Sequence, residues 1–459
     1  MQFFKTEQAA HSILIECITK SHYEDLISTD DHYKQKWLNA SRRDVSPGQH
    51  ILLPTPEGSL DSVLVIVDNP VSVWSIADLS TQLPAGDYHL GDQYTRAEQE
   101  QLILGWGLGA YQYTRYKKQQ PRACLYVDPA LDLARIEALI QATYLTRDLI
   151  NAPANEMLPT HLAAATQQLA EQHHAQFEQI VADQLLAENY PLIHVVGRAS
   201  SDAPRYLRLR WGKPSDPHIA IVGKGVCFDS GGLDIKPSSG MRWMKKDMGG
   251  AAHALGLASY IMQTQLPVYI DLAIPAVENA IAGNAFRPGD VIASRKGLAV
   301  EIDNTDAEGR LVMADAITDL TTANTPDLLI DFSTLTGAAR VALGTEVGVY
   351  FCNDDELASQ LQNTAHAVED DIWRLPLHTG YRRTLDSAIA DLVNCASSGY
   401  GGAITAALFL QEFFSQQCAW LHFDIMAYNM RSRAGRPKGG EAMGLRAVCE
   451  YLERKYRTA

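Results

Sequence analysis

Three short clusters of charged residues follow segments that are typical of β-strands, and their side chains are of kinds that bind metal ions. The first cluster contains Lys224, Asp229 and Lys236, the second contains Asp247, and the third runs from 303 to 310. In α/β sheets, ligands bind beyond the carboxyl ends of the strands. We therefore expect the three clusters to meet at one site.

The four carboxylates in these clusters are the strongest indication of bound metal. They are Asp229, Asp247, Asp306 and Glu308. Like charges a few ångströms apart in a partly dry site cost several kcal/mol each, and two divalent cations would cancel that repulsion. Carboxylate-rich ligation suits Zn²⁺, Mn²⁺ or Mg²⁺, and the seven cysteines form no CxxC pair that would indicate a structural zinc or iron–sulfur site. The residues thus predict a dinuclear metal site.

Each cluster also has a simpler explanation as ordinary structure. Lys224 stands between two glycines and fits a solvated loop. Asp247 and Asp306 fit the N-caps of two helices, and Glu308 with its neighbour Arg310 fits a surface ion pair. Other catalytic patterns, namely HExxH, the GxxxxGK(S/T) phosphate loop and GxSxG, are absent from the sequence. The combination of the three clusters favours the metal site.

The segments that carry these residues resemble the signature of the leucine aminopeptidase (cytosol aminopeptidase) family. The match comprises VGKGVCFDSGGLDIKP from Val222, MKKDMGGAA from Met244 and NTDAEGRL from Asn304. Further agreement comes from RDLINAPANEMLP, AIPAVENAIAGNAFRPGDV, STLTGA and ITAALFLQEF, which begin at Arg147, Ala273, Ser333 and Ile404. The likeness covers nearly all of residues 147–430, whereas the first third of the chain resembles the family only loosely.

The resemblance implies a metal-dependent hydrolase. Such an enzyme removes N-terminal amino acids, leucine preferentially but with broad specificity, from peptides with a free N-terminus, and it uses two divalent ions, Mn²⁺ or Zn²⁺. By the same resemblance, the tighter ion would be held by Lys224, Asp229, Asp247 and Glu308, and the more exchangeable one by Asp229, Asp306 and Glu308. Lys224 can be a ligand only as a neutral amine, which a neighbouring cation favours.

The resemblance also implies the catalytic groups. Lys236 would polarise the scissile carbonyl and stabilise the oxyanion, and a water or hydroxide that bridges the two ions would be the nucleophile. Arg310 would position a bicarbonate ion as the general base. The residues near the first side chain of the substrate would be Met244, Thr334, Leu335, Gly337, Met426 and Asn429. Arg242 and Met426 differ from the residues usual in the family, which bears on substrate preference.

The pattern along the chain predicts an α/β fold with two domains. We expect a smaller N-terminal α/β domain over 1–125, a linking helix within 126–152, and a larger C-terminal catalytic domain over 153–459. In the larger domain, strand-like and helical segments alternate, which indicates a mixed, mainly parallel central sheet covered by helices on both faces. The strand candidates are 194–196, 219–222, 268–274, 299–302, 328–332 and 421–425, and the helix candidates are 249–262, 311–323 and 403–414. Further helices are expected over 95–118 and 131–150.

Composition restricts the partners and the compartment. The formal charge of −15 disfavours binding to nucleic acid or anionic lipid. Seven scattered cysteines fit a reducing compartment, so we expect a cytoplasmic protein. Two uncharged stretches, 248–270 and 392–411, contain polar residues and are expected to be buried core, not membrane spans. The family resemblance implies a homohexamer.

Three alternatives to a broad aminopeptidase remain. Some relatives act as DNA-binding regulatory factors, although the acidic charge argues against that role here. A narrower dipeptidase, for example one acting on cysteinylglycine, would use the same site. An inactive scaffold is the least favoured, because none of the seven proposed metal-binding and catalytic positions is substituted.

Overall fold

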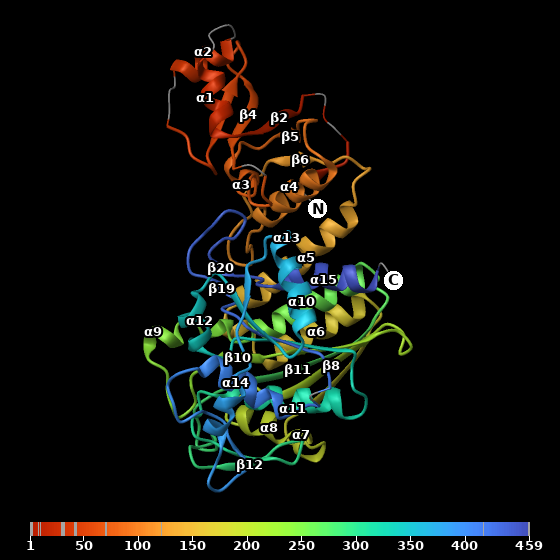
Figure 1. Cartoon of the computed structure of the whole chain (residues 1–459), viewed down its shortest axis with the longest axis vertical. Helices are drawn as coiled ribbons and strands as arrows, with labels where there is room; N and C mark the ends of the chain where they lie inside the picture. The colour runs from red at the N-terminus through yellow and green to blue at the C-terminus, as the bar shows by residue number, and fades with distance from the viewer. Residues whose placement is uncertain are drawn as a thin grey trace. The chain divides into compact units, whose positions relative to one another are not determined.

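The computed structural model describes residues 3–457 with the exception of 8, 10, 29–32, 41–43, 69–70, 121 and 416. The chain forms two compact units, whose elements are labelled in Figure 1. The N-terminal unit comprises Met1–Ile140 and Arg431–Lys438, and the C-terminal unit comprises Gln141–Met430 and Gly439–Ala459. The division falls inside α5 (Leu133–Asn151), a helix that lies where one was expected.

The N-terminal unit is built on a mainly parallel sheet. Among the described residues its order is β1-β6-β5-β2-β4-β3, and only β3 and β4 pair antiparallel. The strands are β1 (Phe4–Lys5), β2 (Ile13–Ile18), β3 (His50–Pro54), β4 (Leu60–Ile66), β5 (Asp87–Leu90) and β6 (Cys124–Tyr126), with helices α1 (Lys20–Ser28), α2 (Tyr33–Ala40), α3 (Leu79–Gln82) and α4 (Arg96–Gly109). The prediction of a smaller N-terminal α/β domain is confirmed.

Helix α4 begins with a capping box. The Thr95 hydroxyl accepts a hydrogen bond from the Glu98 amide, and the Glu98 carboxylate accepts one from the Thr95 amide. The helix ends at Gly109, so the prediction that it continues to 118 was wrong. The residues from 111 on are rich in tyrosine and include a threonine, which have lower helix propensity than the leucines before them.

The glycines of α4 allow close packing. A Cβ on Gly105 would lie 1.7 Å from the carbonyl oxygen of Val73, and one on Gly109 would lie 1.6 Å from that of Ala77. The helix therefore packs directly against backbone, which supports the structural explanation of its glycine spacing.

The C-terminal unit contains a larger sheet that is mixed and mainly parallel, as predicted. In the part of the chain that the structure describes, its order is β16-β15-β18-β14-β9-β11-β8-β7, and β10 also pairs with β11. Three pairs are antiparallel, namely β15 with β18, β11 with β8, and β7 with β8. The bounds are β7 (Gln176–Val181), β8 (Arg205–Trp211), β9 (His218–Gly223), β10 (Gly225–Asp229), β11 (Tyr269–Asn279), β14 (Leu328–Ser333), β15 (Gly348–Cys352), β16 (Ile372–Arg374) and β18 (Trp420–Asp424).

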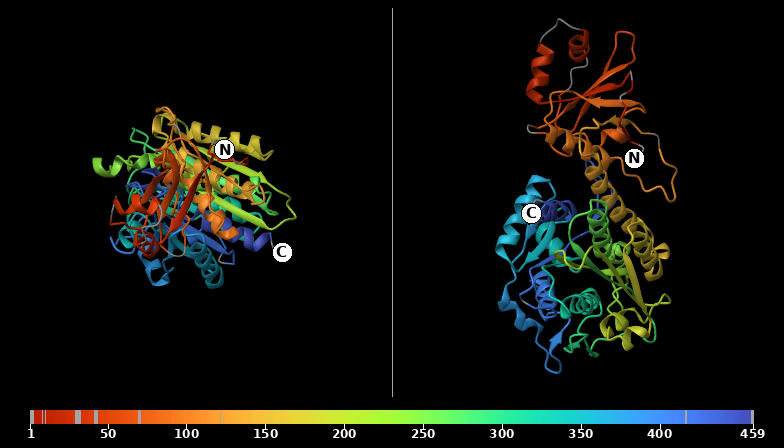
Figure 2. Two further views of the ribbon diagram at one scale, coloured as in Figure 1. Left: turned by 90° about the horizontal axis from the view of Figure 1, so that it is seen from above. Right: turned by 90° about the vertical axis from the view of Figure 1, so that its right-hand side faces the viewer.

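Helices cover both faces of this sheet (Figure 1; Figure 2). On one face lie α6 (Pro159–Gln172), α10 (Gly249–Gln263) and α15 (Leu445–Tyr456), and on the other lie α8 (Pro191–Gly197), α11 (Glu308–Thr322) and α14 (Gly402–Gln411). Helices α10 and α11 both contact β9. The remaining longer helices are α12 (Gly337–Leu343) and α13 (Asp355–Ala367). The predicted arrangement of helices on both faces is confirmed.

One predicted strand is a helix. Residues 194–196 belong to α8, whose first residue, Pro191, has the fixed φ that suits the start of a helix. The apolar side chains of α8 pack against α11 instead of joining the sheet. The predicted strand at 299–302 exists as β13 (Ala299–Glu301), but it lies in a separate sheet with β12 (Val291–Ala293) and β17 (Leu392–Val393).

None of the described helices has both the length and the apolar character that a bilayer crossing requires.

The contact between α4 and Val73 can be tested by adding one methyl group. Because the new Cβ of Gly105→Ala would overlap a backbone carbonyl, we expect the free energy of unfolding to fall by about 1–3 kcal/mol. Chemical denaturation followed by circular dichroism would measure the change. Gly283→Ala is the control, since its Cβ would meet nothing within 4 Å. Equal stability of the two variants would contradict the packing explanation.

Candidate metal centre

The first cluster extends along β10: Lys224 lies between β9 and β10, Asp229 is the last residue of β10, and Lys236 follows that strand. Lys224 follows the last residue of β9, and its side chain is 2% exposed. Its Nζ lies 2.6 Å from Asp247 Oδ2 and 3.0 Å from Glu308 Oε1. Gly250, at the start of α10, packs directly against the backbone beside Lys224. A Cβ on Gly250 would lie 2.7 Å from the Lys224 nitrogen and 2.1 Å from the oxygen of Phe332. The absence of a side chain there lets α10 approach the strand ends.

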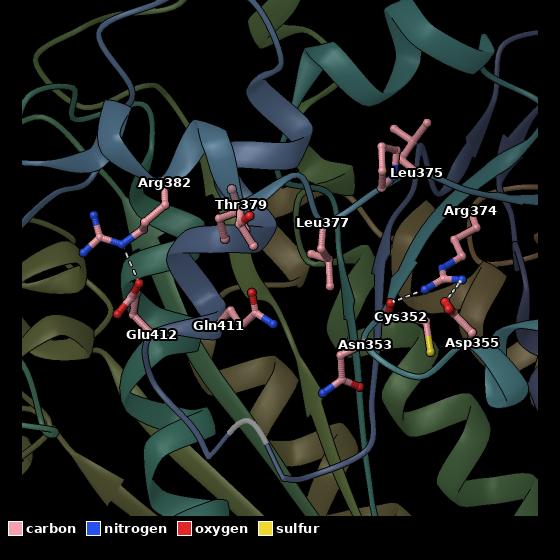
Figure 3. A pocket seen from close by; sticks show the side chains of 12 residues that line it. Cys352, Asn353, Asp355, Arg374, Leu375, Leu377, Thr379, Arg382, Gln411 and Glu412 are labelled. Atoms are coloured by element: carbon pink, nitrogen blue, oxygen red, sulfur yellow. Dashed lines mark hydrogen bonds and ion pairs between the residues drawn. The ribbon is translucent and has the colours of Figure 1, made fainter.

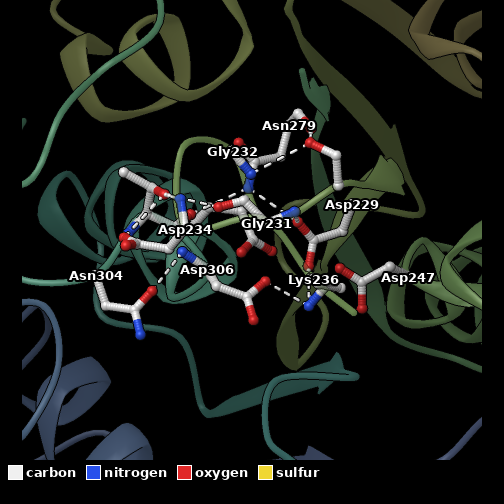
Figure 4. A network of polar contacts seen from close by, with 12 residues as sticks. Asp229, Gly231, Gly232, Asp234, Lys236, Asp247, Asn279, Asn304 and Asp306 are labelled. Carbon is white, nitrogen blue, oxygen red and sulfur yellow. Dashed lines mark hydrogen bonds and ion pairs between the residues drawn. The ribbon is translucent and has the colours of Figure 1, made fainter. Parts of the chain in front are cut away.

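A second lysine lies among the remaining carboxylates. Lys236 Nζ is 2.8 Å from Asp229 Oδ2 and also forms an ion pair with Asp306. Figure 4 shows Lys236 reaching both of these carboxylates, with Asp247 beside it. The structure therefore brings together all four predicted carboxylates and both predicted lysines, from the three clusters.

Hydrogen bonds fix the orientation of the carboxylates. Asp229 Oδ1 accepts from the backbone amide of Gly231 (2.9 Å) and from Asn279 Nδ2 (2.8 Å). The same Asn279 nitrogen donates to the carbonyl of Thr305 (3.0 Å), so this residue connects the first cluster to the third. On the other side of the site, Asp247 Oδ1 accepts from the hydroxyl of Thr334 (2.7 Å).

The simpler explanations of the clusters do not hold. The N-cap residue of α10 is Met248 and that of α11 is Ala307, and neither Asp247 nor Asp306 caps a helix with its side chain. Lys224 is buried, so it is not a solvated loop lysine. Glu308 and Arg310 are also buried, so they do not form a surface ion pair.

The buried carboxylates raise one another's pKa values. Burial raises the pKa of Glu308, and the charge of Asp229 raises it further, to about 8. Burial and Asp229 also raise the pKa of Asp306, to about 6. For Lys224, burial lowers the pKa, but Asp247 and Glu308 outweigh that effect and the net shift is upward. Two lysines thus relieve the repulsion among the carboxylates only in part.

The donor set fits divalent metal ions. One oxygen each of Asp229, Asp306 and Glu308 lie within 4.8 Å of one another. Glu308 Oε1 and Asp306 Oδ1 are buried and have no hydrogen-bond partner with good geometry, although a lysine nitrogen lies close to each. Oxygens that converge without hydrogen bonds are suitable ligands for a hard or borderline cation.

Arg310, in the first turn of α11, is 6% exposed, and its Nη1 has no hydrogen-bond partner. Burial lowers the pKa of its guanidinium. A buried cationic group with an unused donor fits a bound anion.

The residues predicted to lie near the substrate side chain are on three segments beside this centre. Met244 belongs to the short helix η2 (Met244–Lys246), Thr334 and Leu335 follow β14, and Gly337 is the first residue of α12. Met426 is buried just after β18.

Asn429, the last of these predicted residues, belongs to a buried network. Its Nδ2 donates to Glu441, whose carboxylate also pairs with Arg147 (Nη2 to Oε1, 3.0 Å). The side chain that was expected near the substrate is therefore held by Glu441, which in turn pairs with Arg147 on α5.

Sequence reasoning gave no role to Asn279, Thr305, Lys246 or Arg340. Asn279 and Thr305 lie within segments that matched the family signature, which was the available signal. Lys246 also lies within such a segment, MKKDMGGAA from Met244, whereas Arg340 does not; each has a buried nitrogen without a hydrogen-bond partner.

A separate cavity of about 790 Å³ lies at the opposite edge of the sheet (Figure 3). Cys352, which lines it, pairs with Leu421 at the start of β18, because β15 runs antiparallel to β18. Its two arginines are already paired, Arg374 with Asp355 and Arg382 with Glu412. None of the predicted site residues lines this cavity.

Comparison with known proteins gives matches along nearly the whole chain. A model of the cytosol aminopeptidase family, catalytic domain, matches residues 144–449, and a model of the M17 aminopeptidase, N-terminal domain, matches residues 13–129. A probable cytosol aminopeptidase of Chlamydia abortus is 40% identical over 365 residues, which are 75% of this chain and 72% of that protein. One of Chlamydia felis is 44% identical over 324 residues, which are 69% of this chain and 65% of that protein.

Two solved structures are similar in both fold and sequence. A crystal structure of a cytosol aminopeptidase from Coxiella burnetii has a TM-score of 0.95 and 46% identity, and the match covers 100% of each chain. A bottromycin maturation enzyme in complex with Mn has a TM-score of 0.86 and 31% identity, over 97% of this chain and 100% of that one.

The role of Asn279 in orienting Asp229 can be tested through metal affinity. Because Asn279→Ala removes the amide that holds Asp229 and Thr305 together, we expect the affinity for Mn²⁺ to fall about 10- to 100-fold. Isothermal titration of metal-free protein would measure it. Asn284→Ala, which removes an exposed amide bonded to Arg198, is the control and should bind like the parent. Parent-like affinity of Asn279→Ala would show that Asp229 needs no such support.

Proposed function

The chain belongs to the cytosol aminopeptidase family and is a metallo-exopeptidase, and on that premise we propose that it releases the first residue of peptides by means of two divalent metal ions. We further propose a broad range of first residues in which leucine is favoured. The observation that carries the proposal is the cluster of four carboxylates around two lysines, with buried oxygens of Glu308 and Asp306 that lack hydrogen-bond partners.

The metal-binding residues divide between two ions in this proposal. Lys224, Asp229, Asp247 and Glu308 would hold the tighter ion. Asp229, Asp306 and Glu308 would hold the more exchangeable one, with the backbone carbonyl of Asp306 within reach. Lys224 would take part as a neutral amine, although its carboxylate neighbours favour the charged form in the absence of metal. Mn²⁺ or Zn²⁺ is proposed, and the bottromycin enzyme in complex with Mn supports the first.

The chemistry that two bound ions supply is a bridging water or hydroxide, nucleophilic near neutral pH. Lys236 is the electrophilic group of the protein. Burial acts to lower its pKa, but Asp229 and the other carboxylates raise it above the ordinary lysine value, so the side chain stays charged. It would donate to the scissile carbonyl and stabilise the negative charge that develops there.

Arg310 is proposed to bind bicarbonate. Its unpartnered Nη1 in a buried position supports an anion at this point. The bound anion would accept a proton from the nucleophile in place of a side-chain base. The other side chains of the centre are engaged in ion pairs or hydrogen bonds.

A homohexamer and a cytoplasmic location complete the proposal. The hexamer rests on the family resemblance. A reducing compartment is supported by the cysteines, all seven of which are free thiols in the structure.

The division of roles can be tested with two variants. Asp306→Ala removes a proposed ligand, so we expect it to lose one of the two metal ions and most of its activity. Lys236→Ala removes only the proposed electrophile, so we expect it to keep both ions while kcat for leucyl p-nitroanilide falls about 100- to 1,000-fold. Elemental analysis and steady-state kinetics with Mn²⁺ or Zn²⁺ would measure both effects.

The parent protein and Lys213→Ala, which changes an exposed lysine in the loop before β9, at the opposite end of that strand from Lys224, are the controls. If the parent releases nothing from leucyl substrates in either metal, the proposed function is wrong. If Lys236→Ala loses metal as Asp306→Ala does, Lys236 is not the electrophile.

A further inference from the structure

The loop that carries Asp306 into the metal centre is not part of any strand or helix. Residues 303–307 lie between the end of β13 and the start of α11. Asp306 belongs to this loop, and Glu308, the residue directly after it, begins α11. Backbone groups that secondary structure does not pair need partners from side chains or water. The positions of two proposed metal ligands therefore depend on what supplies those partners.

One buried side chain from a distant segment pairs with both ends of this loop. Asn394 is 0% exposed. Its Oδ1 accepts from the amides of Asp303 (2.8 Å) and Asn304 (3.2 Å). Its Nδ2 donates to the carbonyls of Asn304 (2.7 Å) and Ala307 (3.3 Å). A single amide group thus connects the start of the loop to its end, and its burial excludes the water that could replace these bonds.

The small sheet of β12, β13 and β17 fixes Asn394 at this place. Strand β17 pairs in parallel with β13, and Val393, its last residue, lies opposite Glu301. The backbone amide of Asn394 then donates to the carbonyl of Glu301 (2.9 Å). Because β13 leads directly into the loop, the same sheet fixes both the beginning of the loop and the side chain that binds it.

The middle of the loop is held by other residues. The amide of Thr305 donates to Asp234 Oδ2 (2.8 Å), and the hydroxyl of Thr305 donates to the same oxygen (3.1 Å). The amide of Asp306 donates to Asn304 Oδ1 (2.7 Å), within the loop. Figure 4 shows Asp234, Asn304 and Asp306 in this network. Asn394 therefore restrains the two ends of the loop, whereas Asp234 restrains its middle.

We propose that Asn394 is a positioning residue for the more exchangeable metal ion and that it acts through Asp306. This inference rests on the proposed function, in which Asp306 is a ligand of that ion alone. The tighter ion would be affected less, because three of its proposed ligands lie outside the loop, namely Lys224, Asp229 and Asp247. Residues that orient metal ligands without touching the metal typically change its affinity by about 10- to 100-fold.

The test is the affinity of Asn394→Ala for each of the two ions. Isothermal titration of the metal-free protein with Mn²⁺ would resolve the two binding steps. We expect the affinity of the weaker step to fall about 10- to 100-fold and that of the stronger step to change less than about threefold. Hydrogen exchange of the metal-free protein, followed by mass spectrometry, should become faster over 303–307, because two amides lose their acceptor.

Asn353→Ala is the matched control for a loss of stability. The side chain of Asn353, which lines the separate cavity, also joins two backbone groups. Its Nδ2 donates to the carbonyl of Cys418 (2.8 Å), and its Oδ1 accepts from the amide of Trp420 (2.8 Å). We expect its removal to destabilise the protein in a similar way but to leave both metal affinities and the exchange of 303–307 as in the parent.

A second variant decides the test if Asn394→Ala does not fold. Asn394→Ser leaves a single hydroxyl in place of the two amide atoms, so it can form only part of the four bonds. We expect the affinity of its weaker step to lie between those of the parent and Asn394→Ala. Circular dichroism would show whether each variant is folded.

The outcomes separate this inference from the proposed function. If the parent binds only one ion, the proposed pair of ions is wrong and this inference fails with it. If the parent binds two ions but releases nothing from leucyl substrates, only the proposed function fails. If the folded Asn394 variants bind both ions as the parent does, lose both affinities equally, or differ from the parent no more than Asn353→Ala does, this inference alone is overturned.

Discussion

The repulsion among four neighbouring carboxylates, three of them buried, is the constraint on which the rest of the site depends. Two lysines lie between them, yet the pKa values of Glu308 and Asp306 are still raised. Hydrogen bonds fix two of the carboxylates: Asn279 and a backbone amide donate to Asp229, and the hydroxyl of Thr334 donates to Asp247. Bound cations would remove the electrostatic repulsion among these carboxylates in addition to forming metal–ligand bonds, so the site favours cation binding.

The topology of the sheet explains why distant segments meet. Strands β9, β14 and β18 are parallel neighbours, so their carboxyl ends lie at one edge, and β10 and β11 end nearby. Lys224 and Thr334 directly follow β9 and β14, and Asp229 is the last residue of β10. Glu308 begins α11, and Asp247 lies two residues before α10. Helix α10 approaches closely because neither Gly250 in the helix nor Gly223 in β9 has a side chain. The site thus depends on backbone contacts as much as on charged residues.

The sequence allowed the central sheet, the coverage by helices on both faces and the three charged clusters to be predicted, because strand ends and acidic motifs are local signals. It did not allow the secondary structure of 194–196 to be predicted, because a short apolar run fits a strand or a buried helix equally well until its packing partner is known. The predicted end of α4, at 118, was too late because the tyrosines and the threonine after Gly109 have a lower helix propensity than the leucines before it. Arg147 and Glu441 are 294 positions apart, so the ion pair between them is a property of the folded chain alone.

The network of Arg147, Glu441 and Asn429 connects a residue proposed to lie near the substrate to a helix outside the sheet. Asn429 is oriented by Glu441, and Glu441 is neutralised by Arg147 on α5. Loss of the arginine would leave a buried carboxylate uncompensated and release the asparagine from its present position. If Asn429 lies near the substrate as proposed, a substitution on α5 would change the preferred first residue without replacing any group that touches the peptide. A comparison of the pocket residues alone would not detect such a change.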